Sequence, residues 1–119
     1  MRVLVVDNDD GVLDVVCAIL RDCGLEAHAA ADPQEACRLL AAGGWDALLS
    51  DFLFPGSITG LAVAAEARAR GVPGVVIMSG AAEAETQIAA RGLRFLAKPF
   101  AVADLLVALG VSEVVPLAA

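Results

Sequence analysis

The chain has few of the features that mark membrane-inserted or secreted proteins. Hydrophobic residues make up 59% of its 119 residues, but no apolar run approaches the ~18 residues that a membrane-spanning helix needs. The N-terminal residues lead into a short apolar run and then into acids, without the long apolar stretch and cleavage site of a secretory signal. We therefore expect a cytoplasmic protein without membrane insertion.

Positive charge is also scarce. Lys and Arg number 8 against 15 Asp and Glu, which gives a formal net charge of −7. Nucleic-acid binding relies on clustered Lys and Arg, so this composition argues against a nucleic-acid partner. Several of the acids stand early in the chain, where a local negative pocket could hold a hard cation. These acids are Asp7, Asp9, Asp10 and Asp14.

Cysteine and histidine are scarce, and the three cysteines follow neither a disulfide framework nor the spacing of a metal site. Cys17, Cys23 and Cys37 are odd in number, fall in expected helices or at helix ends, and lack metal-ligand spacing. We interpret them as reduced, mostly buried thiols. His28, the single histidine, is interpreted as a strand or loop residue near the surface rather than as a phosphodonor or ligand.

Five apolar runs alternate with five helix-like segments, and Gly, Pro, Asp or Asn marks each change. The expected strands cover residues 3–6, 25–29, 46–50, 75–78 and 93–97. This alternation predicts an α/β fold with a doubly wound, five-stranded parallel sheet in strand order 2-1-3-4-5. We find no internal repeat or long linker. We therefore predict one domain over residues 1–119, with its core at about 2–109 and a tail at 110–119.

Helical spacing predicts which residues face the core. The inward set is Val12, Val15, Val16, Ile19 and Leu20 in the first helix, and Val102, Leu105, Leu106 and Leu109 in the last. The fourth helix, about residues 82–90, has only Ile88 as a large apolar residue, so we expect it to be mobile. Trp45 is expected to pack on the rim, and Phe52 and Phe54 to lie partly exposed beside the strand ends.

Polar residues stand directly after four of the expected strands. Asp7 and Asn8 follow the first strand, Asp51 the third, Ser79 the fourth and Lys98 the fifth. In doubly wound sheets such residues converge in one crevice at the carboxyl ends of the strands. A carboxylate there can attack a phosphoryl group while a divalent cation and an ammonium neutralise the phosphoryl oxygens. The set predicts a phosphoryl-transfer site, whereas Asp51 taken alone would be read as a solvated strand-end acid.

These residues carry a resemblance to the response-regulator receiver family over about residues 2–109. The matching segments are Val-Val-Asp-Asn at 5–8, Ser-Asp-Phe-Leu-Phe-Pro-Gly at 50–56, Ile-Met-Ser-Gly at 77–80 and Leu-Ala-Lys-Pro-Phe at 96–100. Each segment is weak alone, but their order and spacing on four strand ends make the set specific. Residues 51–60 also resemble the longer loop of receivers attached to hybrid histidine kinases. The interval from Ser79 to Lys98 is a few residues shorter than the family pattern.

The resemblance implies a flavodoxin-like receiver fold and a role in two-component phosphorelay signalling. It implies that Asp51 accepts a phosphoryl group from a sensor histidine kinase or a histidine phosphotransfer protein. It also implies a Mg²⁺ cofactor held by Asp7, Asp51 and the Leu53 carbonyl, while Ser79 and Lys98 contact the phosphoryl group. Such a domain is not a conventional enzyme, but it catalyses its own phosphoryl transfer and the hydrolysis of its aspartyl phosphate.

Two residues depart from the family pattern. Asn8 stands where a second acid commonly binds the metal, and its neutral carbonyl should weaken the Mg²⁺ site. Asp9 would compensate only by turning inward from the helix cap that it is expected to form. Phe95 stands where the family often has a tyrosine or another aromatic that swings inward with Ser79 on activation, and it has no hydroxyl. The resemblance further implies a cis peptide bond between Lys98 and Pro99.

Two other functions stay open. A pseudo-receiver would keep the fold, lose efficient metal binding through Asn8 and act as a phosphorylation-independent protein-binding module. A flavin or dinucleotide carrier is disfavoured, because no Gly-x-Gly-x-x-Gly turn follows the first strand and the acids there would repel a pyrophosphate.

Signalling is expected through the face formed by the fourth helix, the fifth strand and the last helix. Ala103, Val107 and Ala108 leave the outer side of the last helix apolar. This side is either an alanine-rich surface or a contact face for a partner or a homodimer.

Overall fold

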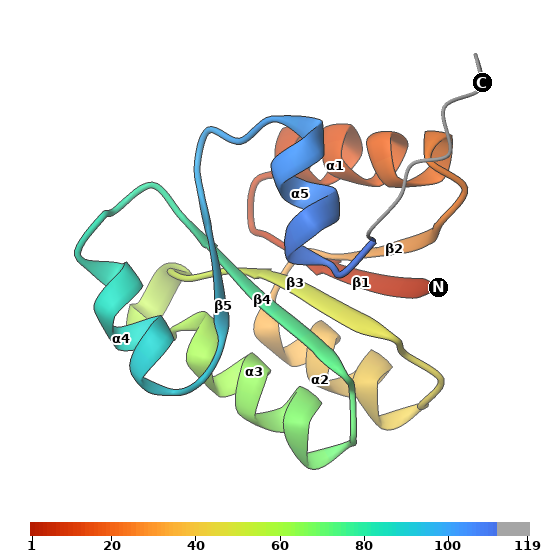
Figure 1. The fold of residues 1–119 in the computed structure, drawn as a ribbon. Coiled ribbons are helices and arrows are strands. Elements are labelled where there is room, and N and C mark those ends of the chain that lie inside the picture. The colour runs from red at the N-terminus through yellow and green to blue at the C-terminus, as the bar shows by residue number, and fades with distance from the viewer. Residues whose placement is uncertain (112–119) are drawn as a thin grey trace.

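Five parallel strands form one sheet at the centre of the computed structural model, which describes residues 1–111 (Figure 1). The strands are β1 (Arg2–Val6), β2 (Glu26–Ala30), β3 (Ala47–Asp51), β4 (Gly74–Ser79) and β5 (Arg94–Ala97). Their order is β2-β1-β3-β4-β5, which confirms the predicted topology. Each strand end lies within one residue of its predicted limit, so that Asp51 and Ser79 are the last residues of their strands.

Helices cover both faces of the sheet, as the doubly wound fold requires. They are α1 (Asp10–Asp22), α2 (Pro33–Ala41), α3 (Gly60–Ala69), α4 (Ala84–Ala90) and α5 (Val102–Ala108), and a short 3-10 turn η1 (Pro55–Ser57) precedes α3. Helices α1 and α5 lie on one face, and α2, α3 and α4 lie on the other (Figure 1). No helix in residues 1–111 is long and apolar enough to cross a membrane. The predicted tail lies, from residue 112 onward, outside the described residues.

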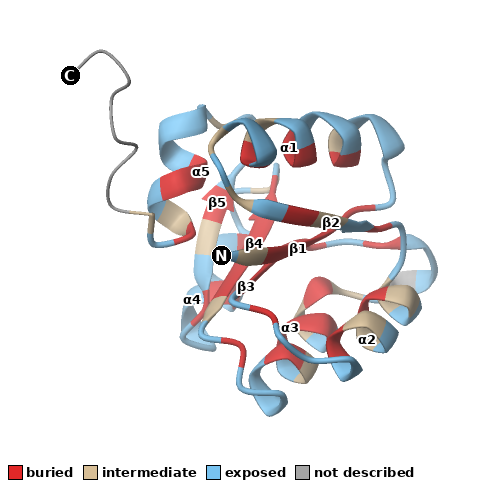
Figure 2. Cartoon of the chain, turned by 90° about the vertical axis from the view of Figure 1, so that its right-hand side faces the viewer, coloured by how far each residue is buried: buried red, intermediate tan, exposed pale blue. Residues whose placement is uncertain are grey.

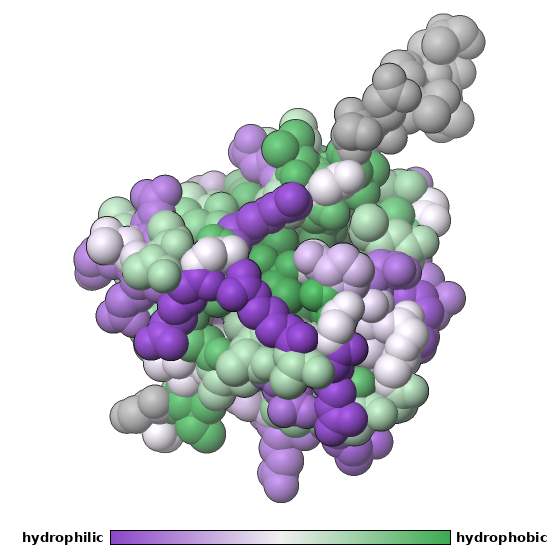
Figure 3. All heavy atoms as spheres, turned by 60° about the horizontal axis from the view of Figure 1, so that its bottom comes forward, coloured by the Kyte–Doolittle hydropathy of each residue, from purple (hydrophilic) through white to green (hydrophobic). Residues whose placement is uncertain are grey.

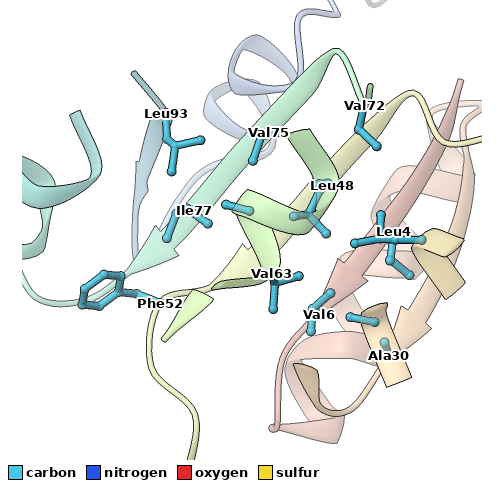
Figure 4. Packing of buried hydrophobic residues seen from close by; sticks show 14 of the residues in the cluster. Leu4, Val6, Ala30, Leu48, Phe52, Val63, Val72, Val75, Ile77 and Leu93 are labelled. Atoms are coloured by element: carbon cyan, nitrogen blue, oxygen red, sulfur yellow. The ribbon is translucent and has the colours of Figure 1, made fainter. Parts of the chain in front are cut away.

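The sheet is held by a hydrophobic cluster on each face (Figure 2). On the side of α2–α4, Leu4, Leu48 and Ile77 pack beneath the helices (Figure 4). Because side chains alternate along a strand, Val3 and Val5 point into the opposite cluster, under α1 and α5. Burial on both faces fixes the strand register, since a slip by one residue would exchange the two clusters. The carboxyl ends of β1, β3, β4 and β5 are therefore aligned at one edge.

Side-chain caps fix where the first two helices begin. Asp9 Oδ1 accepts hydrogen bonds from the N–H groups of Gly11 at 2.9 Å and Val12 at 3.2 Å. Asp32 Oδ1 accepts from the N–H of Glu35 at 2.7 Å. Such caps satisfy backbone donors that the first helical turn leaves unpaired. Asp9 is thus committed to the α1 terminus, which agrees with its interpretation as a cap.

The predicted buried faces are wrong in part. Val15 is 60% exposed and Val102 is also exposed, whereas Leu13 and Cys17 are buried in α1. In α1 the reason is the roll of the helix about its axis, which turns the face of Leu13, Val16, Cys17 and Leu20 toward the sheet and leaves Val15 outside. Phe52 and Phe54, expected to be partly exposed, are buried (Figure 4 shows Phe52). After β3 the chain turns toward α3, which carries both rings into the cluster on that side.

The rim at the start of β1 is built around Trp45. The Trp45 indole N–H donates to the Leu39 carbonyl at 2.8 Å, and the Arg2 guanidinium lies 4.3 Å from the ring centroid. His28, which is half-buried, meets Trp45 edge-on and lies 2.6 Å from Glu26 Oε2. The hydrogen bonds from His28 and Arg2 lower the pKa of Glu26. His28 is thus a strand residue near the surface, in the middle of β2.

The three cysteines are free thiols. Cys17 is buried, while Cys23 and Cys37 are only partly buried, so the expectation of mostly buried thiols holds fully for one of them. Burial raises the pKa of the Cys17 and Cys37 thiols. A raised pKa keeps both in the unreactive thiol form at neutral pH.

Helix α4 is held by two buried side chains and by one arginine of α3. Its only buried side chains are Ala84 and Ile88. Arg68 of α3 donates from its two Nη atoms to the carbonyls of Arg91 and Gly92, each at 2.6 Å, which ties down the end of α4. Figure 3, which brings the lower side of Figure 1 forward, shows hydrophilic residues interleaved with apolar ones on this side.

Replacing Arg68 by Gln should loosen α4 and leave the sheet unchanged. The two hydrogen bonds from Arg68 contribute about 1 kcal/mol to the local stability of α4. We therefore expect amide hydrogen exchange in residues 84–92 to quicken roughly five-fold. Exchange measured by mass spectrometry checks this. Arg70→Gln, which removes only the exposed pair with Glu66, is the matched control. Equal exchange in the two variants would contradict the anchoring role.

Candidate functional site

The side chains of Asp7, Asp51 and Lys98 meet at the carboxyl edge of the sheet. Lys98 Nζ lies 2.9 Å from Asp7 Oδ2 and 3.3 Å from Asp51 Oδ1. The Asp7, Asp51 and Lys98 side chains are 2%, 17% and 26% exposed, respectively. Lys98 is the only lysine of the chain. Two largely desolvated carboxylates therefore share one ammonium, which leaves a net negative charge in the pocket.

This arrangement shifts the titration of two of its members. Partial burial raises the pKa of Asp51, the negative charge of Asp7 raises it further, and Lys98 opposes both effects. For Lys98, burial works to lower the pKa, but the hydrogen bond to Asp7 and the charges of both carboxylates outweigh burial and raise it. Lys98 is therefore protonated at neutral pH. The pocket presents a fixed positive charge beside a carboxylate that is costly to ionise without a further cation.

The loop after β3 is closed on itself. Leu53 pairs with Thr59 in an isolated antiparallel bridge, and the Leu53 side chain is 56% exposed. The Phe52 N–H donates to Asp51 Oδ1 at 3.0 Å, which orients the carboxylate. The Leu53 backbone is thus fixed by its bridge to Thr59, two residues after Asp51 along the chain.

Ser79 is buried at the end of β4. Its Oγ accepts a hydrogen bond from the Ala81 N–H at 3.0 Å, and its carbonyl accepts one from the Lys98 N–H at 2.9 Å. Among residues 1–111, the Ser79 hydroxyl makes no hydrogen bond to Asp7, Asp51 or the Lys98 ammonium. Ser79 therefore lies at the carboxyl edge of the sheet, and its hydroxyl points toward the loop that follows β4.

A family comparison decides what kind of domain carries this pocket. The model of the response regulator receiver domain matches residues 3–110 of the chain. The chain belongs to the receiver domain family. The resemblance predicted from the strand-end motifs is thereby confirmed.

Solved receiver structures agree with this assignment. The receiver domain from the hybrid histidine kinase CckA is 34% identical, with a TM-score of 0.77, over 92% of this chain and 96% of that one. The chemotaxis response regulator CheY4 of Vibrio cholerae is 27% identical, with a TM-score of 0.79, over 96% and 98%. The receiver domain of the sensor histidine kinase PA1611 from Pseudomonas aeruginosa PAO1 is 25% identical, with a TM-score of 0.77, over 91% and 93%, and has a magnesium ion coordinated in its active site cleft. Among curated proteins, none matches this chain significantly.

The side chains in the pocket of this receiver fit Mg²⁺ better than a metal ion that is bound entirely by protein ligands. In the described part of the chain, no group of three or more Asp, Glu, His or Cys side chains could hold a metal ion. Asp7 and Asp51 nevertheless converge, and Mg²⁺ is usually bound through one or two carboxylates while it keeps several waters. Zinc would instead require three or four protein ligands. The donor set therefore fits a partly hydrated Mg²⁺.

The remaining predicted residues of this receiver lie around the pocket rather than in it. Asn8 is exposed, and its side chain makes no hydrogen bond within residues 1–111. Phe95 is half-buried on β5 and packs against the cluster on the α4 side. The peptide bond between Lys98 and Pro99 is cis.

The surface of this receiver has two grooves, a mostly apolar one beside α1 and a mixed one beside α5. One, of about 640 Å³, lies between α1 and the segment after β5 and includes Val15, Lys98 and Phe100. The other, of about 780 Å³, lies between β5 and α5 and includes Arg94, Asp104 and Val107. The first groove could not be predicted from sequence, because helical spacing alone places Val15 inward. The groove becomes apparent only when the structure shows that Val15 is exposed.

Thr59 and Gly60 are interpreted from sequence as loop and helix-start residues rather than as catalytic ones, and the motifs do not reveal that Gly60 contacts Asp51. Gly60 is buried at the first position of α3 and lies against the backbone of Asp51. A glycine at an expected helix start, after a threonine able to cap, gives only a weak signal of this contact.

Proposed function

We propose that this domain is a phosphorelay receiver in which Asp51 accepts a phosphoryl group from a phosphohistidine. The donor would be a sensor histidine kinase or a histidine phosphotransfer protein, acting in the cytoplasm. The observation that carries the proposal is the contact of Lys98 Nζ with Asp7 at 2.9 Å and with Asp51 at 3.3 Å. Membership of the receiver family and the similarity to receivers of histidine kinases support it.

In the transfer, a carboxylate oxygen of Asp51 forms a bond to phosphorus as the bond between phosphorus and the donor imidazole breaks. The imidazole leaves with that electron pair and takes up a proton. Lys98 neutralises charge on the phosphoryl oxygens, and Ser79 would contact one of them after its hydroxyl turns away from Ala81. Hydrolysis by water later restores Asp51 and releases inorganic phosphate.

Asp7, Asp51 and the Leu53 carbonyl are the residues that would hold Mg²⁺, with Asn8 as a weak additional donor. The ion would neutralise further charge on the phosphoryl oxygens. The negative pocket left by two carboxylates and one ammonium supports this assignment.

Incubation with Mg²⁺ and a small phosphodonor such as phosphoramidate should add one phosphoryl group to the chain, as measured by intact mass. A chelator should prevent the addition. An unmodified chain over a wide range of Mg²⁺ concentration would contradict the proposal. A titration with Mg²⁺ and beryllofluoride separates the pseudo-receiver alternative, which should give no saturable response at the pocket.

Replacing Asn8 by Asp should tighten Mg²⁺ binding. A full negative charge beside Asp7 strengthens attraction for the cation, and we expect an affinity gain of about ten-fold, or about 1.4 kcal/mol. The added repulsion should also lower the stability of the metal-free domain. Calorimetric titration with Mg²⁺ measures the gain, and Asp10→Asn, which removes a neighbouring acid of α1, is the control. An unchanged affinity in Asn8→Asp would place residue 8 outside the metal site.

We propose that a protein donor docks on the groove beside α1, because Lys98 lines both this groove and the pocket that holds Asp51. The wall of the groove is mostly apolar, and Val15 is largely exposed there. Burial of such a side chain contributes about 1.5–3 kcal/mol.

Val15→Asp should therefore slow phosphoryl transfer from a protein donor by at least about ten-fold. Modification by a small phosphodonor should remain at the wild-type rate. The two rates, measured on the same protein, form an internal control. Equal slowing with both donors would show damage to the pocket and would contradict a docking role.

We propose that output passes through the face of α4, β5 and α5, with Ser79 and Phe95 as the switch residues. Val107 is 71% exposed there and lines the second groove together with Arg94 and Asp104. An apolar centre with one charge of each sign suits contact with a partner or with a second copy in a homodimer.

A further inference from the structure

Helix α3 begins in direct contact with the backbone of the proposed phosphoacceptor. Gly60 is buried, and a Cβ added to it would overlap the Asp51 carbonyl oxygen and lie 3.2 Å from Ser50 Oγ. The Gly60 N–H donates to the Phe52 carbonyl at 2.6 Å. The chain therefore leaves the sheet at Asp51 and returns to touch that residue at Gly60.

Position 60 requires glycine because there is no room for a side chain, and not because of its backbone conformation. Gly56, in the same loop, has a φ of 81°, and a Cβ there would meet nothing within 4 Å. Gly60 has no positive φ, so its backbone would suit any residue, but the Asp51 carbonyl leaves no room for a side chain. Thr59, directly before it, makes no side-chain cap to α3. The helix start is thus located by packing against Asp51.

The same contact sets the shape of the loop that contains Leu53. Leu53 bridges to Thr59, and the Phe54 N–H donates to the Ile58 carbonyl at 2.9 Å. Gly60 closes this ladder at the Phe52 carbonyl. Moving the start of α3 away from Asp51 would therefore shift the backbone of Leu53 relative to the Asp51 carboxylate.

We infer that Gly60 is a positioning residue for phosphoryl transfer: its missing side chain lets α3 begin against Asp51 and holds the Asp51 carboxylate and the Leu53 carbonyl at a fixed separation. The inference rests on the proposed function, which makes these two groups donors to Mg²⁺. Displacement of a reacting group by about 1 Å can slow a reaction by about 100-fold. Gly60 acts through Asp51 and Leu53 and touches no reacting atom.

The test compares Gly60→Ala with two controls. Gly74→Ala adds the same methyl group at the far end of β4, where the new Cβ would lie 3.4 Å from Ala47 Cβ, an ordinary contact. Val63→Ala empties a buried site in the hydrophobic cluster on the same helix, and so reports on lost stability. All proteins are compared at a temperature at which they are folded.

Gly60→Ala should weaken Mg²⁺ binding, measured by calorimetry, at least ten-fold and quicken amide exchange of residues 52–60 in metal-free protein. Gly74→Ala and Val63→Ala should bind Mg²⁺ within two-fold of wild type. A Gly60→Ala affinity equal to that of wild type or of Val63→Ala would overturn the inference. Absence of Mg²⁺ binding by wild type would instead contradict the proposed function itself.

A measurement on wild type covers the case in which Gly60→Ala does not fold. Coupling between two sites is reciprocal, so Mg²⁺ must stabilise the contact that positions its donors. Saturating Mg²⁺ should slow exchange of the Gly60 amide at least three-fold more than it slows the amides of α2, which holds none of the proposed metal donors. A Gly60 amide slowed no more than those of α2 would overturn the inference.

Discussion

Asp51→Asn is expected to abolish phosphorylation and, in metal-free protein, to raise the melting temperature. The amide lacks the anionic oxygen that attacks phosphorus, so no covalent product should form. It also removes one of two carboxylates that share a single ammonium. Relief of this repulsion should stabilise the domain at pH 7 by about 1 kcal/mol, which corresponds to roughly 4 °C.

The stability gain of Asp51→Asn should depend on pH. The pKa of Asp51 is raised in the folded state above its ordinary 3.8, mainly by burial and then by Asp7. Above pH 3.8 the folded state therefore binds more protons than the unfolded state, and wild-type stability falls as pH rises through this interval. The variant lacks this fall, so the difference in melting temperature should open above about pH 4 and close below it.

Added Mg²⁺ should reverse the order of the two proteins. Wild type gains stability from the bound ion, whereas Asp51→Asn has lost a carboxylate donor and should gain little. Thermal melts at several pH values, with and without Mg²⁺, measure the stability gain of Asp51→Asn, its dependence on pH and its reversal by Mg²⁺. Asp46→Asn, which changes an exposed acid just before the start of β3, is the control and should stay phosphorylatable. A metal-free Asp51→Asn domain less stable than wild type at pH 7 would contradict the described charge balance.

Lys98→Met should slow phosphorylation by at least about 100-fold, because loss of one preorganised charge-stabilising group typically costs that much. It should also lower the stability of the metal-free domain at pH 7 by about 2 kcal/mol, since Asp7 and Asp51 then face each other without a counter-charge. Loss of Lys98 removes the effect that opposes the rise in the pKa of Asp51. Stability should consequently fall more steeply with rising pH than in wild type.

Mg²⁺ separates the chemical role of Lys98 from its structural one. The ion can replace the lost positive charge, so Mg²⁺ should stabilise Lys98→Met more than wild type. Phosphorylation should remain slow in Mg²⁺, because the ammonium that contacts the phosphoryl oxygens is still absent. Arg91→Met, which removes an exposed cation, should change neither property. Recovery of the wild-type phosphorylation rate by Lys98→Met in Mg²⁺ would contradict the chemical role.

The convergence of Asp7, Asp51 and Lys98 could be predicted from sequence because it depends on few quantities. Apolar runs with turn residues locate the strand ends, and parallel strands buried on both faces align those ends at one edge. Small errors in the strand limits did not matter, since each was no larger than one residue. The family motifs then assigned a role to each residue at that edge.

What could not be predicted depends on contacts that leave no periodic pattern. The exposure of Val15 and the burial of Phe54 follow from how each element rolls against the sheet, and residue spacing does not determine that roll. The Ser79 hydroxyl turns toward Ala81, a choice among rotamers that its place on β4 does not specify. The contact between Gly60 and Asp51 joins backbone to backbone, so it depends on the absence of a side chain.

The most direct test of phosphoryl transfer to Asp51 is to trap the modified residue. Borohydride reduction converts an aspartyl phosphate into homoserine, and peptide sequencing then locates it. After reaction of wild type with a phosphodonor and Mg²⁺, we expect homoserine at position 51 and at no other acid, and none when a chelator is present. Phosphate incorporated into the chain with homoserine at another acid, or with none at position 51, would contradict the assignment of Asp51 as the acceptor.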